Sequence, residues 1–281
     1  MDVLLAPFNF EFMQRAFAMS LLAAIPTALL SCFLVVRGWA LLGDAVSHSV
    51  LPGVVLAYMV GIPLLLGAFG AAMLCALASG YLSNNSRIKP DTAMGVVFSG
   101  MFGLGIVLYT AIETDVHLDH ILFGNLLGVE THELWTSGLI GLAVVTGLLL
   151  FWRDLRFHSF DPAQAQLTGL PVNTLYYGLL SALSLTIVAT LSATGLILAI
   201  GLLIAPGAIA FLVTRTLSQM MIVSVSVCVF SMVTGVYLSY FLDSAPAPTA
   251  ILVFTILFII VFITKQVQTH SRVSAVIQRI T

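Results

Sequence analysis

Residues 62–82, IPLLLGAFGAAMLCALASGYL, contain no charged side chain. A helix of this length is long enough to cross the roughly 30 Å hydrocarbon core of a bilayer. Other apolar runs, such as Leu21–Val36 and Ile251–Thr264, have the same character, and none has the short-period alternation of a barrel strand. Because lipid offers the backbone no hydrogen-bond partner, such runs cross a membrane as helices. The sequence therefore predicts an all-α, polytopic helical membrane protein.

The composition of the whole chain agrees with this class. Of its 281 residues, 60% are hydrophobic and 8% are charged, whereas soluble domains carry about 25% charged residues. We expect about eight or nine spans, roughly at residues 15–36, 41–60, 62–82, 92–112, 134–152, 173–190, 194–214, 219–241 and 248–264. They form a predicted transmembrane domain over residues 1–264, followed by a cytoplasmic tail at 265–281. The three cysteines, Cys32, Cys75 and Cys228, fall within spans and predict small buried residues rather than a disulfide framework or a metal cluster.

The distribution of lysine and arginine predicts the orientation. With the C-terminus in the cytoplasm, nine of the ten basic residues lie on the cytoplasmic side: Arg37, Arg87, Lys89, Arg153, Arg156, Arg215, Lys265, Arg272 and Arg279. Lys and Arg are concentrated in the short cytoplasmic loops of membrane proteins. We therefore expect the N-terminus outside the cell and the C-terminus inside.

Two apolar segments contain a Pro-Gly pair, one in each half of the chain. They are VLPGVV at residues 50–55, with Pro52 and Gly53, and IAPGAI at residues 204–209, with Pro206 and Gly207. Because proline removes a backbone donor and crowds the preceding turn, each pair is expected to kink or break its helix. Paired interruptions of this kind can mark a transport pathway. The alternative is a pair of packing kinks.

A glycine-rich stretch, GVVFSGMFGLG at residues 95–105, places Gly95, Ser99 and Gly103 four residues apart. This spacing predicts a thin helix face for close packing. The stretch has neither the preceding strand nor the spacing of a nucleotide-binding loop, and no loop ending in Gly-Lys-Ser or Gly-Lys-Thr occurs in the chain. Any dependence on ATP must therefore come from another chain.

Asp44 and His48 are separated by one helical turn inside an apolar segment, so they lie on one helix face. A carboxylate and an imidazole together suit divalent manganese, iron or zinc. Ionisable groups within spans are costly and point to function. One alternative is an Asp–His hydrogen bond at the membrane interface. Another is an ion pair between Asp44 and Arg37, which would require the chain to bend at Gly38.

The segment between the spans that end at residue 152 and begin at residue 173 predicts a short helix at 162–168. Asp161 is a good N-cap, Pro162 suits the first helical position, and Gly169 can end the helix in a left-handed conformation. The alternative is an ordinary connector at the membrane surface. His158, just before this helix, is expected to be solvated.

The loop predicted on the outer side is rich in acidic residues and histidines: Glu113, Asp115, His117, Asp119, His120, Glu130, His132 and Glu133. Its middle, ILFGNLLGV at residues 121–129, is too short to span and is expected to dip into the outer membrane interface. The acidic ends could raise the local cation concentration or meet a binding protein. The alternative is a solvated loop.

Four segments together resemble the permease subunits of metal-ion ABC importers, closest to the manganese/iron importers of the Yfe and Sit type. They are GWALLGDAVSHSVLPGVVLAY (38–58), FDPAQAQLTGLPV (160–172), GLILAIGLLIAPGAIAFLVTR (195–215) and FLDSAPAPT (241–249). The resemblance extends to about residue 264. The remaining tail matches no segment of that family.

This resemblance implies an inner-membrane permease subunit of an ATP-driven importer of manganese or iron, with zinc as a further candidate. Asp44 and His48 would contact the metal in transit. A cytoplasmic ATPase pair would dock on the coupling segment, residues 160–171, which includes Phe160, Asp161, Pro162, Ala165 and Gly169. A periplasmic protein would deliver the metal, and a second permease subunit, identical or related, would complete a dimer. Membrane lipid is the other partner; the resemblance implies no permanently bound cofactor and no nucleic acid.

Two other classes of function compete with this one. An ion-coupled secondary carrier would use Asp44 and His48 as a proton relay, and would transport without ATP in a proton gradient. An intramembrane enzyme or an assembly scaffold is the third class. No catalytic constellation, such as paired metal-binding motifs or a Ser–Lys dyad, supports an enzyme.

Overall fold

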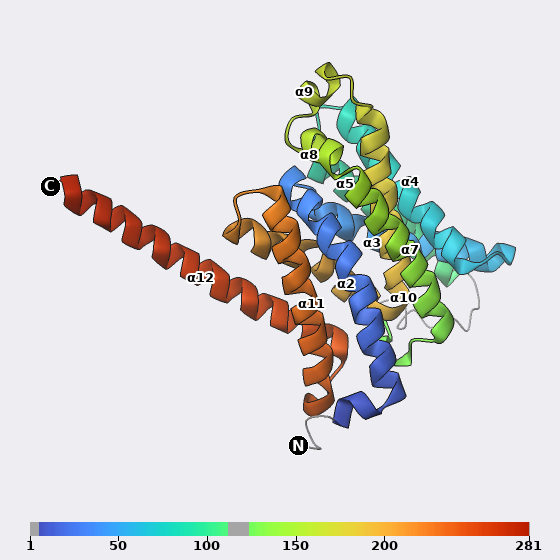
Figure 1. Ribbon diagram of the computed structural model, residues 1–281. Coiled ribbons are helices and arrows are strands. Elements are labelled where there is room, and N and C mark those ends of the chain that lie inside the picture. The colour runs from blue at the N-terminus through green and yellow to red at the C-terminus, as the bar shows by residue number, and fades with distance from the viewer. Residues whose placement is uncertain (1–5, 112–123, 281) are drawn as a thin grey trace.

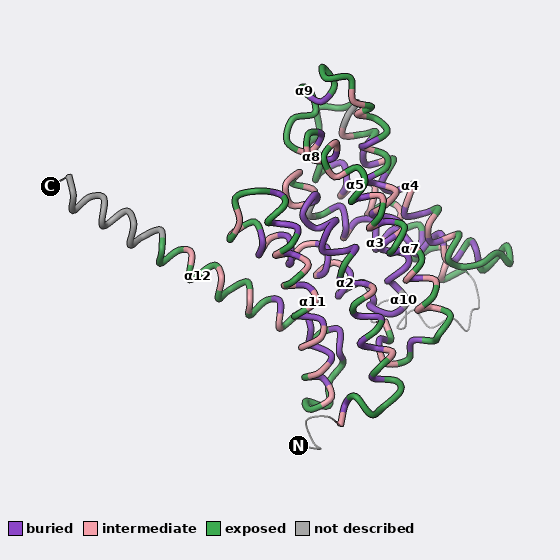
Figure 2. Tube along the Cα trace, in the orientation of Figure 1, coloured by how far each residue is buried: buried purple, intermediate pink, exposed green. Residues whose placement is uncertain are grey.

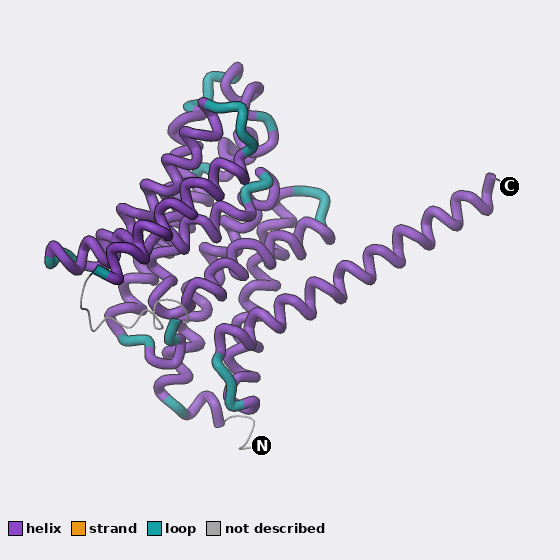
Figure 3. The backbone as a smooth tube through the Cα atoms, turned by 180° about the vertical axis from the view of Figure 1, so that it is seen from behind, coloured by secondary structure: helices purple, strands orange, loops and turns teal. Residues whose placement is uncertain are grey.

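The computed structural model describes the backbone of residues 6–111 and 124–280, and within it all side chains except those of 40, 84, 192, 196, 197 and 269–280. These residues form helices and connecting loops, without any strand (Figure 3). The predicted all-α class is confirmed. The elements are η1 (Ala6–Asn9), α2 (Glu11–Arg37), α3 (Ala40–Val60), α4 (Leu64–Asn85), α5 (Pro90–Thr110), η2 (Leu126–Gly128), α7 (Thr131–Leu150), α8 (Trp152–Phe160), α9 (Pro162–Leu167), α10 (Val172–Val213), α11 (Leu217–Leu242) and α12 (Pro246–Ile280).

Within the described residues, eight helices are long and apolar enough to cross a membrane, and a shorter apolar helix covers Leu198–Val213. The two spans expected at 173–190 and 194–214 both belong to α10. Their boundary is Gly195, which has φ 68° and ψ 172°. Only glycine adopts this backbone conformation readily. The break in α10 therefore occurs at a glycine, and not at Pro206.

The helices α2 and α10 form the centre of the molecule, where the buried residues in Figure 2 concentrate. Phe33 of α2 and Ile187 of α10 are among the fully buried large side chains. In the apolar membrane-spanning part of α2, 72% of the residues are buried, against 17% in that of α5. Hence α5 lies at the edge of the molecule, where lipid or another chain must cover its apolar face.

The two Pro-Gly pairs do not interrupt their helices. Pro52 lies inside α3 and Pro206 inside α10. The two glycines instead allow close helix packing: a β-carbon at Gly53 would collide with the carbonyl oxygen of Gly67 in α4, and one at Gly207 would collide with Ser31 in α2. One lost hydrogen bond at a proline is thus outweighed by the packing on either side. The predicted break at Pro52 and Pro206 is wrong, because both helices continue through the proline. The other predicted possibility, a kink, is compatible with a continuous helix.

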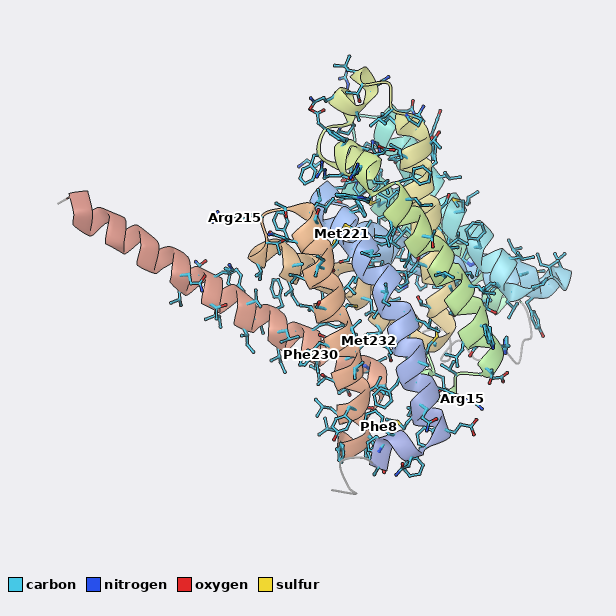
Figure 4. The ribbon with its side chains drawn as sticks, in the orientation of Figure 1. Phe8, Arg15, Arg215, Met221, Phe230 and Met232 are labelled. Atoms are coloured by element: carbon cyan, nitrogen blue, oxygen red, sulfur yellow. The ribbon has the colours of Figure 1, made fainter. Side chains whose placement is uncertain are left out.

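Labelled arginines mark the two ends of the bundle. Arg15 lies toward the end that holds the N-terminus and Arg215 toward the other (Figure 4). The short helices α8 and α9 project at the end away from the N-terminus (Figure 1). The long helix α12 leaves the body after Ala247, Ala250 and Phe254, which are buried, and continues as a helix beyond residue 264. The division into a domain ending at 264 and a tail stays a prediction.

Candidate functional site

Asp44 and His48 lie on one face of α3, as predicted, and their side chains contact each other. The Nε2 atom of His48 lies 3.3 Å from Oδ1 of Asp44. The side chain of His48 is 26% exposed and that of Asp44 is 34% exposed. A nitrogen and an oxygen of the kinds that bind divalent metals therefore face each other at a partly exposed position.

Two aromatic rings of α5 hold the imidazole in place. The ring of His48 lies 5.6 Å from that of Phe98 and 5.4 Å from that of Phe102, measured between centroids. Its Nδ1 atom is buried and has no hydrogen-bond partner among the described residues. The rings restrict the histidine to a narrow range of orientations, with Nε2 directed at Asp44.

Glycines position α3 between its two neighbours. A β-carbon at Gly43 would lie 2.9 Å from Cδ1 of Leu203 in α10, and one at Gly105 of α5 would lie 2.9 Å from Cδ of Pro52. Each glycine therefore lies closer to the neighbouring helix than a residue with a larger side chain could. Small residues therefore bring α10 and α5 against the helix that carries Asp44 and His48.

The polar groups around the pair are already used within α3. The hydroxyl of Ser47 donates to the carbonyl of Gly43 at 2.7 Å, and that of Ser49 donates to the carbonyl of Val46 at 2.8 Å. Pro52 has no N–H to give to the carbonyl of His48, four residues earlier. Among the described residues, no group of three or more His, Cys, Asp or Glu side chains is placed to hold a metal ion. Within the part of the chain that the structure describes, Asp44 and His48 therefore form a pair without a third such side chain beside them.

The alternative ion pair between Asp44 and Arg37 is wrong. The Nη2 atom of Arg37 donates to the carbonyl oxygen of His158 at 2.8 Å, and its guanidinium carbon lies 4.3 Å from the centre of the Trp39 ring. His158 is likewise not solvated as predicted, because only 2% of it is exposed. The packing of α8 against α2 and α10 removes it from water.

The short helix expected after Asp161 is confirmed as α9. The Asp161 carboxylate accepts the N–H of Gln164 at 2.9 Å, Pro162 takes the first helical position, and Gly169 has φ +80°. Phe160 is 63% exposed, whereas Ala165 is fully buried. Phe160 is therefore available to a partner, and Ala165 can act only by packing α9 in place.

The described part of the outer loop packs against the protein. Leu126 and Val129 are buried, and Gly124 packs against the backbone of α10 at Gly195. The expected dip of this stretch into the outer membrane interface stays a prediction. The other part of the loop, with Glu113, Asp115, His117, Asp119 and His120, lies outside the described residues.

The start of α7 holds the remaining three residues of the outer loop. The side chains of Glu130 and Glu133 cap the helix reciprocally, and Nδ1 of His132 lies 3.2 Å from a carboxylate oxygen of Glu130. All three border a cleft of about 380 Å³, whose other wall includes Val50 and Val54 of α3. This cleft therefore reaches α3 within two turns of His48.

The family model described as "ABC 3 transport family" matches residues 9–265 of the chain. The chain belongs to that family. The permease is 48% identical over 266 residues to the chelated iron transport system membrane protein YfeD of Yersinia pestis, covering 93% of the permease and 88% of YfeD. It is 43% identical over 255 residues to the manganese transport system membrane protein MntC of Halalkalibacterium halodurans, covering 90% and 87%.

A solved structure has the same arrangement of helices. PsaBC from Streptococcus pneumoniae, in complex with a Fab, superposes with a TM-score of 0.81 at 34% identity, over 91% of the permease and 92% of that chain. The predicted resemblance to metal-ion ABC permeases is confirmed by these relatives. The lack of an ATPase motif agrees with the place of a permease within an ABC transporter.

Sequence reasoning missed three features of the permease. Phe98 and Phe102 are one helical turn apart, an aromatic pair whose contact with His48 depends on the packing of α5 on α3. Leu167, at the end of α9, is 88% exposed; a leucine in a short polar segment was the available signal. The contact of Arg37 with His158 joins residues 121 positions apart and left no local pattern.

Proposed function

We propose that the permease carries manganese or iron as divalent ions into the cytoplasm, as the membrane subunit of an ATP-driven importer. The single observation that carries this proposal is the pairing of Asp44 with His48 on α3, where both side chains are partly exposed and two aromatic rings contact the imidazole. Relatives named for chelated iron and for manganese support the choice of metals. Carboxylate plus imidazole suits zinc as well, so competition among the three ions has to rank them.

The geometry suits an ion in transit better than one that stays. A metal between Oδ1 of Asp44 and Nε2 of His48 would replace part of its water shell with one oxygen and one nitrogen. The carboxylate would offset part of the ion's charge inside the membrane, where an uncompensated charge is costly. Two protein ligands leave most coordination positions to water or to a second subunit. The ion can therefore leave as readily as it enters.

A second permease subunit, identical or related, would complete the site. The α5 helix supports this, because it is largely exposed and lies next to His48. Gly95 and Gly103 have open space where a β-carbon would stand. The thin face predicted from their spacing is therefore free for a partner to approach closely. The ions would then pass between the two subunits.

The cytoplasmic ATPase would dock on α9 and the residues around it. Phe160 and Leu167 are large apolar side chains exposed at this end of the molecule. Asp161, Pro162 and Gly169 define the ends of the helix and so fix where these side chains lie. A periplasmic protein would deliver the metal at the opposite end, toward the cleft beside Glu130 and His132. In this orientation the N-terminus would lie outside and the C-terminus in the cytoplasm of a bacterial cell.

The two Pro-Gly pairs would lie along the pathway. Pro52 and Gly53 follow His48 by about one turn on α3, and Pro206 and Gly207 lie on α10, which contacts α3 through Leu203 and Gly43. Their close contacts with α4 and α2 support a role in shaping the passage between helices.

Metal uptake by vesicles that contain the reconstituted complex tests the proposal. Manganese, iron and zinc should compete with one another for uptake. This uptake should require ATP on the side of the vesicle membrane where the ATPase lies. It should persist when the proton gradient is collapsed. Uptake that needs no ATP and follows an imposed proton gradient would instead favour the ion-coupled carrier, with Asp44 and His48 as a proton relay.

A further inference from the structure

The connection between α2 and α3 is short and carries an arginine. Arg37 ends α2, Gly38 turns the chain with φ +70°, and Trp39 is the N-cap of α3. The guanidinium of Arg37 lies over the ring of Trp39, at 4.3 Å, and 5.9 Å from the ring of Tyr176 in α10. The rings of Trp39 and Tyr176 themselves meet edge-on at 5.4 Å. The Arg37 side chain therefore packs on Trp39, the residue directly before α3, which carries Asp44 and His48.

The same guanidinium reaches the end of α8. Its Nη2 atom donates to the carbonyl of His158 at 2.8 Å. This carbonyl cannot receive the usual helical N–H, because the residue four positions later is Pro162, the first residue of α9. Arg37 supplies the missing donor. The arginine thus uses a carbonyl that the last turn of α8 leaves open.

The surroundings of His158 keep this contact free of charge repulsion. The imidazole is buried and packs edge-on against Tyr176 at 6.4 Å. Burial, and then the charge of Arg37, lower the pKa of His158 to about 4. The histidine is therefore neutral at neutral pH, and the guanidinium faces an uncharged ring and a carbonyl oxygen.

The contact crosses a cleft instead of a packed wall. A cleft of about 340 Å³ is lined by Arg37, Trp39, His158, Pro162 and Tyr176, among others. Among the described residues, neither α8 nor α9 packs extensively against α3; both contact α10, and α8 also contacts α2. With space beside it, the end of α8 could shift without displacing α3 unless a side chain joins the two. Arg37 is that side chain.

We propose that Arg37 is a positioning residue that couples the ATPase-docking segment to the metal-bearing helix. A displacement of α8 and α9 would pull the His158 carbonyl, the guanidinium and Trp39 as one unit, and so move the start of α3. Asp44 lies five residues after Trp39, about 7.5 Å along the same helix. The displacement therefore reaches the metal pair through a single rigid element. This inference rests on the proposed function.

The test compares variants of the reconstituted complex in metal imported per ATP hydrolysed. Arg37→Met keeps the length of the side chain but removes its charge and all its donors. It should leave membrane insertion, ATPase copurification and basal ATP hydrolysis unchanged, and lower the metal imported per ATP about tenfold. Arg37→Lys keeps a charged donor without the planar group and should fall between Arg37→Met and wild type. Arg153→Met is the matched control, because Arg153 is an exposed arginine of α8 that contacts Trp152 of its own helix.

Two further variants separate coupling from mere stability. Trp39→Leu leaves the bond to His158 but removes the ring beneath the guanidinium, and should also lower the metal imported per ATP. His158→Phe retains the backbone carbonyl and an aromatic ring, and should leave the ratio unchanged. If Arg37→Met fails to assemble, Trp39→Leu decides the question.

Each outcome has one reading. A wild-type ratio in an assembled Arg37→Met complex, or in Trp39→Leu if that variant decides, overturns this inference and leaves the proposed function intact. A wild-type complex that imports no metal with ATP overturns the proposed function and this inference with it.

Discussion

His48 and His158 have the same local sequence feature and opposite surroundings. Each histidine stands four residues before a proline, Pro52 or Pro162, so each has a carbonyl without its usual helical donor. The ring of His48 is partly exposed beside Asp44, whereas His158 is buried beneath Arg37 and Tyr176. One histidine presents a ring nitrogen beside a carboxylate, and the other offers a backbone carbonyl to an arginine.

The difference teaches that the role of a histidine depends on which elements pack around it. His48 faces α5 at the edge of the molecule, and its side chain stays partly exposed. His158 lies where α8 meets α2 and α10, and it is buried there beside a cleft that it helps to line. The four predictions that follow test whether the two histidines are as distinct as their surroundings indicate.

The largest effect is expected at Asp44 and His48. Asp44→Asn keeps the shape but removes the charge that offsets a divalent ion, and His48→Ala removes the nitrogen ligand. Either change should reduce ATP-driven metal uptake to background while expression and ATPase association persist. The double variant should be hardly worse than either single one, because residues that share one ligand are not additive.

Ser47→Ala is the matched control for this pair, since the Ser47 hydroxyl is on the same helix but bonds to its own backbone. Normal uptake by well-folded Asp44→Asn and His48→Ala permeases would remove the distinction between the two histidines, and with it the proposed metal contact.

The second prediction concerns the proline that follows His158. Replacing Pro162 and Gly169 with alanine should spare membrane insertion but lower ATPase copurification and uptake, about tenfold, because α9 loses its defined ends. Gln166→Ala, within α9 and exposed, serves as the control. Unchanged copurification and uptake in the double variant would argue against docking on α9.

The third prediction concerns the rings that hold His48. Phe98→Leu and Phe102→Leu keep apolar bulk but loosen the imidazole, so ATP-driven uptake should fall about threefold for each. Expression should not change. An equal loss in Phe157→Leu, an exposed ring of α8 far from His48 in sequence, would mean that the assay responds to aromatic residues in general.

The smallest effect is the contribution of His158 to the pH dependence of stability. In the unfolded chain a histidine binds a proton below about pH 6.5, whereas His158 in the folded protein does so only below about pH 4. The unfolded state therefore binds more protons between these values, and stability falls as the pH drops from 6.5 to 4. His158→Phe should remove this loss, so its melting temperature should drop less between pH 7 and pH 5, by about 2–4 °C. Equal drops in both proteins would contradict the neutral, buried state of His158.

The sequence predicted features that depend on neighbours along the chain. The spans follow from the lengths of the apolar runs, and the short helix at 162–167 follows from Asp161, Pro162 and Gly169. The pairing of Asp44 and His48 follows from one helical turn. In each case a few adjacent residues contain all the information, because helix geometry and capping are set within a turn.

Only the tertiary structure decided what surrounds these elements. The burial of His158, the choice of His158 instead of Asp44 as the partner of Arg37, and the aromatic pair against His48 all join helices that are far apart in the chain. The course of α10 also depends on distant residues. It continues through Pro206, where Ser31 of α2 packs against Gly207, and it breaks at Gly195, where Gly124 packs against it. An apolar chain can place almost any of its faces against another, so the periodicity of one helix does not specify its neighbour. Close packing between helices selects the arrangement, and with it which histidine is buried and which stays partly exposed.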